Sequence, residues 1–239
     1  MPNDAGTDRV HAAVRGAHVS VAARDLRTGA VLSYGPGERY LAASVAKIAI
    51  LAVLLVQARA EGRPLTGRER DLAARMIRVS DNDAAHELWN RTGRDAAMDG
   101  VLRAFGLTET RTTPESWGLT RTSAADQVRL VAALAGDASD VLDQERRAYV
   151  LDLMAGVAAD QRWGIEAVAR PGERLEVKDG WLDYSGHDGR WTVNSVGRIS
   201  GDGRDLVLAV LSDDHATLDD GLAVVERAAV AAAGVVRDG

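Results

Sequence analysis

Residues 44–60 read SVAKIAILAVLLVQARA, a stretch that starts with a serine and carries apolar residues on almost every side. This pattern predicts one long helix from Ser44 to about Ala60, where Gly62 and Pro64 end it. A helix that is apolar all round is typical of the buried centre of a helical cluster. Its uninterrupted apolar run, residues 48–56, is too short to span a bilayer.

The chain has 29 lysines and arginines in total. Only two of them, at positions 47 and 178, are lysines. A guanidinium does not lose its proton in a protein, whereas a buried lysine amine can have a lowered pKa and act as a base. A plain bias towards arginine would leave two lysines by chance. The alternative is that these two positions need an amine, and the apolar surroundings of Lys47 favour it.

Ser44 and Lys47 are spaced for nucleophilic catalysis. A serine at a helix start lies near unpaired backbone N–H groups and the positive end of the helix dipole. A lysine three residues later lies one turn along on the same face. A neutral, desolvated amine in that position can accept the serine proton, which makes Ser44 a candidate nucleophile and Lys47 its candidate base.

The rest of the chain predicts strands at both ends and helices in the middle. A hairpin is expected over residues 18–25 and 30–34, and three later strands over 175–177, 192–200 and 206–212. Helices are expected over 68–79, 83–91, 95–105, 123–135, 140–157 and 218–233. These elements predict an α+β fold, an α/β sandwich in which both chain ends build one antiparallel sheet with flanking helices. Residues 1–38 and 158–239 would form this α/β lobe, and residues 39–157 an inserted all-helical lobe, with the active site between the two.

Composition narrows the classes of function. A net charge of −6 without a basic cluster argues against a nucleic-acid partner. The chain has no cysteine, and its five histidines show no metal-ligand spacing, so neither a metal site nor a cofactor is expected. The first 20 residues lack an apolar run of signal-peptide length. The sequence as it stands therefore predicts a cytoplasmic protein, or one whose export signal has been removed, and we expect a monomer without a membrane partner.

Two further motifs follow Ser44-x-x-Lys47 in order. Ser80-Asp81-Asn82 lies between two predicted helices, and Lys178-Asp179-Gly180 ends a predicted strand. Together the three motifs resemble the signature of the serine β-lactamase and penicillin-binding protein superfamily, in particular compact class A β-lactamase-like proteins. The resemblance covers nearly the whole chain and implies the same two-lobed fold. It also implies a serine hydrolase that forms an acyl-enzyme with a β-lactam or a D-Ala-D-Ala-like amide, which would be its small-molecule or peptide-like substrate.

The resemblance implies a role for each motif residue. Ser44 would be acylated with Lys47 as its general base, and Ser80 would carry a proton to the leaving nitrogen. Lys178 would stay charged beside Ser80 and attract a substrate carboxylate, and Asn82 would bind the substrate's side-chain amide.

The resemblance also assigns substrate-binding residues further along the chain. The backbone N–H groups of Ser44 and Trp181 would form the oxyanion hole. Gly180 and Asp179 belong to the same motif, and Arg190 is placed like a second arginine that binds a carboxylate. An exposed turn residue is the alternative for Arg190.

Three departures from the family pattern affect the predicted chemistry. Asp179 replaces the usual threonine or serine, and its carboxylate would either repel an anionic substrate or pair with an arginine elsewhere. Only 35 residues lie between Ser44 and Ser80, which predicts a more open cleft. In the stretch 112–120 that would hold the deacylating water, Glu115 is the only carboxylate, and a solvated loop glutamate is the alternative. Without such a base, the acyl group could pass to an amine or alcohol, as in a transacylase or cyclase, or the protein could be a covalent binder that does not turn over.

Overall fold

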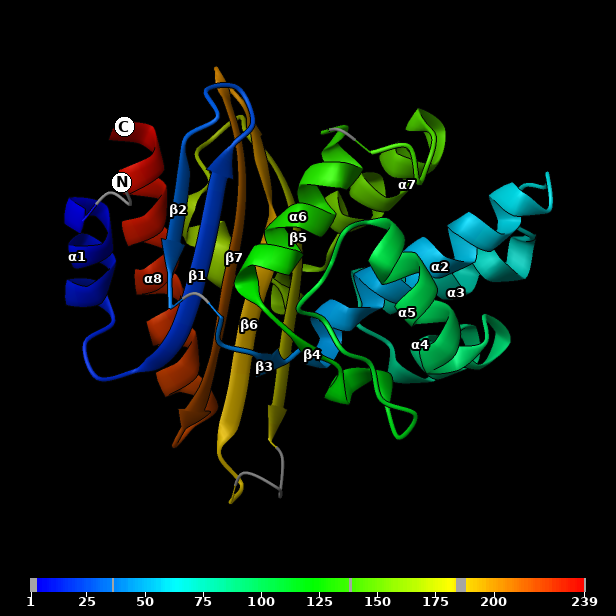
Figure 1. Ribbon diagram of the computed structural model, residues 1–239, viewed down its shortest axis with the longest axis horizontal. Helices are drawn as coiled ribbons and strands as arrows, with labels where there is room; N and C mark the ends of the chain where they lie inside the picture. The colour runs from blue at the N-terminus through cyan, green and yellow to red at the C-terminus, as the bar shows by residue number, and fades with distance from the viewer. Residues whose placement is uncertain (1–3, 36, 138, 184–187, 239) are drawn as a thin grey trace.

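A five-stranded antiparallel sheet forms one half of the computed structural model, which describes residues 4–35, 37–137, 139–183 and 188–238 (Figure 1). The strand order is β2 (Val31–Tyr34), β1 (His18–Asp25), β7 (Arg204–His215), β6 (Trp191–Gly201) and β5 (Arg174–Asp183). Both chain ends therefore contribute to one sheet, as the sequence predicts. β5 is an edge strand, so its outer side is free to face other elements.

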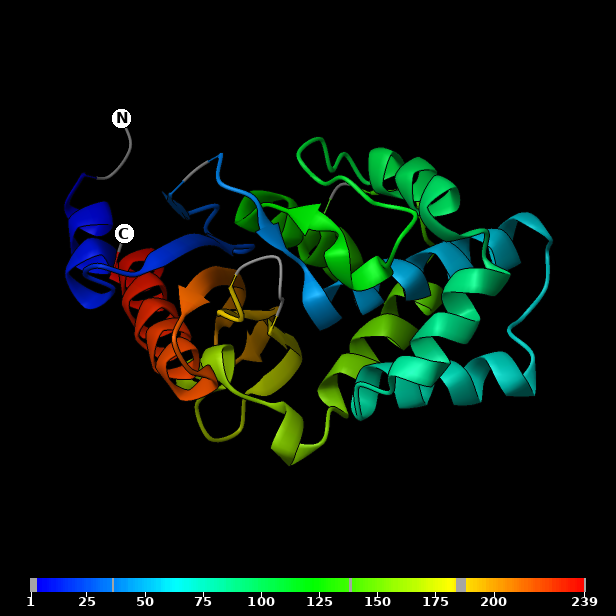
Figure 2. The same ribbon diagram turned by 90° about the horizontal axis from the view of Figure 1, so that it is seen from below.

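Helices cover both faces of this sheet. On one face, α8 (Leu218–Asp238) packs against β1, β6 and β7, and α1 (Asp4–Ala13) packs beside α8. On the other face, α6 (Ala124–Ala135) packs against the same three strands and α7 (Gln144–Ala155) against β5. Figure 2 shows this sandwich from below, with α1 and α8 on the side away from the helical lobe. The predicted α+β sandwich is confirmed.

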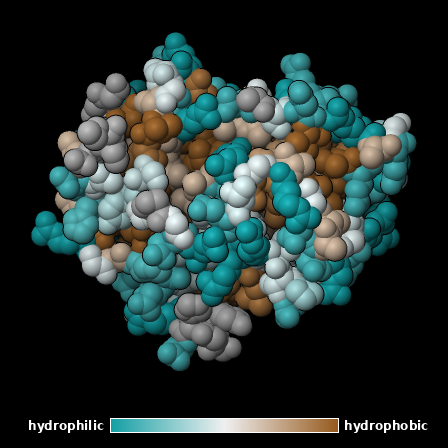
Figure 3. Space-filling view, in the orientation of Figure 1, coloured by the Kyte–Doolittle hydropathy of each residue, from teal (hydrophilic) through white to brown (hydrophobic). Residues whose placement is uncertain are grey.

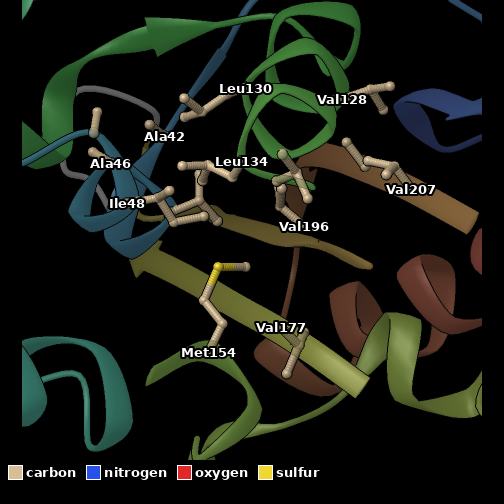
Figure 4. Packing of buried hydrophobic residues seen from close by; sticks show 14 of the residues in the cluster. Ala42, Ala46, Ile48, Val128, Leu130, Leu134, Met154, Val177, Val196 and Val207 are labelled. Atoms are coloured by element: carbon tan, nitrogen blue, oxygen red, sulfur yellow. The ribbon is translucent and has the colours of Figure 1, made fainter. Parts of the chain in front are cut away.

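The apolar helix identified from the sequence is the centre of the helical lobe. A short 3-10 turn, η1 (Ala43–Val45), leads into α2 (Ala46–Ala60), and every residue from 46 to 55 is buried. By length and composition, Ala43–Ala60 could cross a membrane, but 78% of this window is buried inside the fold. Three further helices, α3 (Gly67–Arg78), α4 (Asn82–Arg91) and α5 (Arg94–Ala104), pack around it. Figure 4 shows side chains of α2, α6, α7 and the sheet meeting in one shared apolar core.

Polar residues dominate the face of the molecule seen in Figure 1, and apolar residues reach it only as separate patches (Figure 3). The largest hollow described, about 850 Å³, lies between β1–β2 and α6. None of the candidate catalytic residues lines it. The size of a hollow therefore does not mark the candidate site in this protein.

Three local features differ from the sequence prediction. β5 spans ten residues instead of three, so the Lys178-Asp179-Gly180 motif lies in the middle of a strand and does not end it. Aspartate and glycine are poor strand formers, and here pairing with β6 overrides that preference. The helix α1 and a two-stranded ribbon of β3 (Tyr40–Leu41) and β4 (Arg121–Thr122) were not predicted. The division into lobes at residues 38/39 and 157/158 stays a prediction.

We predict that Gly197→Ala destabilises the sheet by about 1–3 kcal/mol, because overpacking at a rigid site has roughly this cost. A Cβ on Gly197 would lie 2.2 Å from the backbone oxygen of Glu176 on the neighbouring strand. Gly100→Ala in α5 is the control, since its Cβ would meet no atom within 4 Å. Urea unfolding should show a lower free energy of unfolding for Gly197→Ala and an unchanged one for Gly100→Ala. Equal stability of the two variants would contradict the strand packing described here.

Candidate active site

The segment before Ser44 is held in an unusual backbone conformation. Ala43 has a φ of +47°, which is rare for a residue with a side chain and costs on the order of 1–3 kcal/mol. The buried amide of Asn194 on β6 donates hydrogen bonds to the carbonyls of Leu41 (2.8 Å) and Ala42 (3.2 Å). The Ala42 N–H donates to the Thr120 carbonyl at 2.7 Å. These contacts fix Ser44, which is 9% exposed, at the N-terminal end of α2.

Gly180 allows β5 to approach this segment closely. A Cβ at position 180 would lie 2.7 Å from the Ser44 nitrogen and 2.9 Å from the Val45 nitrogen. Both contacts are shorter than a real Cβ tolerates, so only glycine fits without a shift of the backbone. The glycine of the motif thus brings the middle of β5 directly against the candidate nucleophile.

Lys47 is fully buried one turn after Ser44 and donates hydrogen bonds to three oxygens. These are the Ser80 carbonyl at 2.6 Å, the Ser80 hydroxyl at 3.0 Å and the Asn82 side-chain oxygen at 2.8 Å. Its amine also lies 4.8 Å from the centre of the Trp117 ring, which is within cation–π range. The first two motifs are therefore in direct contact.

Lys178 reaches the same serine from the sheet. Its amine donates to the Ser80 hydroxyl at 3.0 Å and to the Asp179 carbonyl at 2.9 Å, and the side chain is fully buried. Ser80 itself has a φ of +55°, again rare for a non-glycine residue. The hydroxyl of Ser80 thus joins the two lysines of the chain, one from each half of the molecule.

Burial makes one of these amines a base near neutral pH. Loss of hydration and, to a smaller degree, the positive charge of Lys178 lower the pKa of Lys47 to about 7, while Asp81 opposes the shift. Burial also lowers the pKa of Lys178, and the adjacent Asp179 opposes that shift. A substantial fraction of Lys47 is therefore uncharged at neutral pH and able to accept a proton.

The middle residue of Ser80-Asp81-Asn82 has a structural task. The Asp81 carboxylate caps α4 by accepting the Ala84 N–H at 3.0 Å, and it also accepts from Arg75 at 2.9 Å. An N-cap of this kind typically stabilises a helix by about 1 kcal/mol. Asp81 thereby fixes the turn that presents Ser80 and Asn82 to Lys47.

The side chain of Asp179 does not line the cleft, contrary to the expectation from the sequence. Alternate residues of a strand point to opposite faces, and Lys178 and Gly180 occupy the face towards Ser80 and Ser44. The fully buried Asp179 carboxylate lies on the other face, where it accepts the Trp163 N–H at 2.7 Å. Burial raises its pKa. The carboxylate thus neither repels a substrate in the cleft nor pairs with an arginine.

Trp181 follows the same alternation. Its ring packs edge-on against Trp163, with the centroids 5.0 Å apart, on the face that holds Asp179. The indole is therefore not directed to Ser44. The role predicted for the backbone N–H of Trp181 in the oxyanion hole does not depend on the ring and stays a prediction.

Arg190 and Glu115 do not join the cluster. The exposed Arg190 guanidinium donates to the Asp214 carbonyl at 3.0 Å and pairs with the Asp214 carboxylate, so the turn-residue alternative describes it better. Glu115 is exposed, and the only hydrogen bond described for it joins its own N–H to Thr113. The element that packs against the Ser44 segment from this loop is η2 (Trp117–Leu119). It presents Trp117 to Lys47 instead of a carboxylate.

Asn194 and Trp117 are site residues that the sequence reasoning missed. Asn194 stands in an apolar strand, and a buried amide at such a position must find hydrogen-bond partners, which is a weak signal in the sequence. Trp117 belongs to the stretch 112–120, where the family resemblance points to a carboxylate and not to an aromatic ring. Within the described residues, no group of three or more His, Cys, Asp or Glu side chains is arranged to hold a metal.

Comparison with known proteins assigns the family. A family model described as "Beta-lactamase enzyme family" matches residues 64–235, a range that includes Ser80 and Lys178. The chain belongs to this family. Proteins of Mycobacterium tuberculosis and Mycobacterium bovis, each named "Putative lipoprotein LppW", are 33% identical over 205 residues. The alignment covers 82% of this β-lactamase-family chain, which spans 64% of the length of those relatives.

Solved structures of the same fold agree with this assignment. "Structure of PBP-A" superposes with a TM-score of 0.83 at 18% identity and covers 100% of this chain and 98% of its own. The TLA-1 extended-spectrum β-lactamase gives 0.84 at 15% identity over 98% and 99% of the two chains. A class A β-lactamase from Mycobacterium abscessus gives 0.79 at 20% identity over 95% and 97%. These likenesses establish the class A β-lactamase fold.

We predict that the two lysines can be titrated separately, because a sample labelled at lysine Cε carries only two labelled side chains. In an NMR titration, the Lys47 signal should change with a midpoint near pH 7. Lys178→Met should raise the pKa of Lys47 because it removes a nearby positive charge, whereas Lys178→Arg should keep that pKa low. A Lys47 midpoint close to the ordinary value of about 10.4 would contradict the desolvated base.

Proposed function

We propose that the protein forms an acyl-enzyme through Ser44 with a β-lactam or a D-Ala-D-Ala-like amide. One observation carries this proposal: the Ser80 hydroxyl lies 3.0 Å from the amines of both Lys47 and Lys178, and Lys47 has a pKa of about 7. A neutral amine, a hydroxyl that can relay a proton and a fixed cation are thus in contact beside a serine. This combination suits acyl transfer from an amide.

The first step requires a nucleophile and a base. Ser44 Oγ attacks the amide carbonyl carbon and forms the new C–O bond, while its proton passes to the neutral amine of Lys47. The negative charge that develops on the carbonyl oxygen would be stabilised by the backbone N–H groups of Ser44 and Trp181. Loss of one such donor typically costs about 3–4 kcal/mol of transition-state stabilisation.

The second step breaks the amide bond. The C–N bond cleaves as Ser80 gives its proton to the leaving nitrogen and regains one from the Lys47 ammonium. Lys178 stays protonated during these transfers, because the adjacent Asp179 favours its charged form. Its charge can then attract a substrate carboxylate. Asn82 accepts a hydrogen bond from Lys47 through its oxygen, which leaves its amide N–H₂ available to a substrate carbonyl.

We further propose that the acyl-enzyme is hydrolysed slowly. Trp117 occupies the position next to Lys47, and the carboxylate of Glu115 is exposed in the loop. One solved neighbour is a PBP-A mutant described as an acyl-enzyme complex with penicillin G. That description supports acylation of this chain as well. Transfer of the acyl group to an amine is the second candidate function. Among the residues that the structure describes, no carboxylate forms a hydrogen bond with Lys47, and this favours transfer over rapid hydrolysis.

The relatives named as lipoproteins favour an exported location for this protein. A substrate of the D-Ala-D-Ala type would then meet the protein outside the cytoplasm. We propose this location together with the substrate class.

Incubation with benzylpenicillin should add the mass of one penicillin to the protein, and intact mass spectrometry over time measures both its formation and its loss. Ser44→Ala should abolish the adduct. Lys47→Arg should slow its formation by about 10²–10⁴-fold, because arginine keeps the charge but cannot accept the proton. An adduct that clears within minutes would contradict slow hydrolysis, and product analysis with added amines would detect transfer. Normal acylation by Lys47→Arg would contradict the role of Lys47 as base.

The rate of acylation should rise with pH through a midpoint near 7. The reason is that Lys47 accepts a proton only when it is neutral, and burial lowers the pKa of this amine to about 7. Second-order rates of adduct formation between pH 5.5 and 8.5 measure the effect. A rate that falls over this range would contradict a neutral Lys47 as the base.

A further inference from the structure

Two arginines share one face of the small ribbon that leads to Ser44, and a third arginine lies beside them. Arg121 lies opposite Leu41 in the β3–β4 pair and opposite Arg111 in an isolated bridge, which has two backbone hydrogen bonds of 2.8 and 2.9 Å. Residues directly opposite on antiparallel strands project to the same side. The register places Leu41, Arg121 and Arg111 together. Arg39 lies just before β3, and its carbonyl accepts a hydrogen bond from the Arg121 guanidinium at 3.3 Å.

The opposite face of the ribbon is buried and fixed. Tyr40, Thr110 and Thr122 are each 5% exposed or less. The Thr110 and Thr122 hydroxyls share a hydrogen bond of 2.9 Å across the ribbon. A shift in register by one residue would bury the arginines and expose these groups. The guanidinium groups of Arg111 and Arg121 are thus held towards solvent by the packing behind them.

Arg111 and Arg121 line a hollow of about 360 Å³, which is within the size range of small-ligand pockets. Its apolar lining comes from Leu41 and Leu119, and its charged sides include Arg111 and Arg121. The other lining residues are Thr112, Thr113 and Glu115. Apolar contacts together with hydroxyls and guanidinium groups suit a small amphipathic molecule.

Two arginines and one glutamate line this pocket, so the net charge of its lining is positive. Within the described part of the chain, none of the three arginines has a carboxylate partner at ion-pair distance, although many other arginines do. One N–H of Arg111 donates to the Thr110 carbonyl at 2.8 Å, and one of Arg121 donates to the Arg39 carbonyl at 3.3 Å. The remaining N–H groups of each guanidinium stay available to a ligand. The nearby Glu38 carboxylate lies 3.9 Å from His18.

We propose that this pocket binds a small anion with a carboxylate or phosphate group and a compact apolar part. The fork of an arginine matches both oxyanions with two parallel hydrogen bonds. The site is separate from the acylation cluster, since none of its lining residues is Ser44, Lys47, Ser80 or Lys178. It is nevertheless adjacent, because the three Cα–Cα steps from Leu41 to Ser44 span at most about 10 Å.

Binding can be measured in the Ser44→Ala protein, so that the outcome is independent of acylation. Three probes of similar shape are benzoate, phenyl phosphate and the neutral benzamide, each added at constant ionic strength. NMR signals of the arginine Nε–Hε groups report binding directly. We expect saturable shifts with the two anions and none with benzamide. The tighter of the two anions identifies whether the pocket favours a carboxylate or a phosphate.

Substitutions that remove a positive or a negative charge test the electrostatics of the pocket. Arg111→Gln and Arg121→Gln should each weaken anion binding at least tenfold, and Arg121→Lys should weaken it less because the charge remains. Glu115→Gln should strengthen binding because it removes a negative charge from the lining. Arg27→Gln, at an exposed arginine on the turn between β1 and β2, is the matched control and should change nothing.

Three results would overturn the proposal. The first is binding of benzamide as tight as that of benzoate, which would show an apolar hollow without selectivity for anions. The second is a loss of anion affinity in Arg27→Gln equal to that in Arg111→Gln and Arg121→Gln, which would show that anions are attracted to the protein surface in general. The third is the absence of saturation with either anion. Failure of the acyl-enzyme proposal would appear separately, as the lack of a benzylpenicillin adduct on the unsubstituted protein.

Discussion

The contact on which the site depends is the shared hydrogen bonding of Lys47 and Lys178 to the Ser80 hydroxyl. Two amines in a buried place repel each other when both are charged, and burial adds to that cost. The repulsion is relieved when one of the two amines is neutral. The lowered pKa of Lys47 makes this amine the one that loses its proton. The interaction thus joins the helical half to the sheet and supplies a base.

The backbone around the site is shaped to bring these groups together. Ala43 and Ser80 both have positive φ values, and they lie in the two segments that carry the candidate nucleophile and the proton relay. Gly180 lets β5 approach the Ser44 nitrogen, and the Asn194 amide holds the carbonyls before it. Strain at such positions persists only where surrounding contacts over-determine it. Here the apolar packing of α2 and the pairing of β5 with β6 provide those contacts.

Sequence reasoning succeeded where a local pattern implies a local structure. Periodicity and turn residues predicted the helices other than α1, and most strands, to within a few residues. The all-apolar stretch correctly predicted a buried central helix. The predicted helix start at Ser44 is close to the observed one, since Ser44 lies in the 3-10 turn that leads into α2. Reasoning from the sequence failed for the length of β5, because Asp179 and Gly180 do not resemble strand residues. It also failed for the β3–β4 ribbon, because each of its strands is only two residues long.

The sequence by itself determined the family, the α+β fold and the identity of the two amines, because motif spacing and hydrophobic periodicity are properties of nearby residues. Only the tertiary structure decided where the side chains of Asp179, Trp181, Arg190 and Glu115 lie. The direction of a side chain in a strand follows from its register, and its partners come from segments far away in the sequence, such as Trp163 for Asp179. The same holds for the pKa of Lys47, since its burial and the approach of Lys178 exist only in the folded chain.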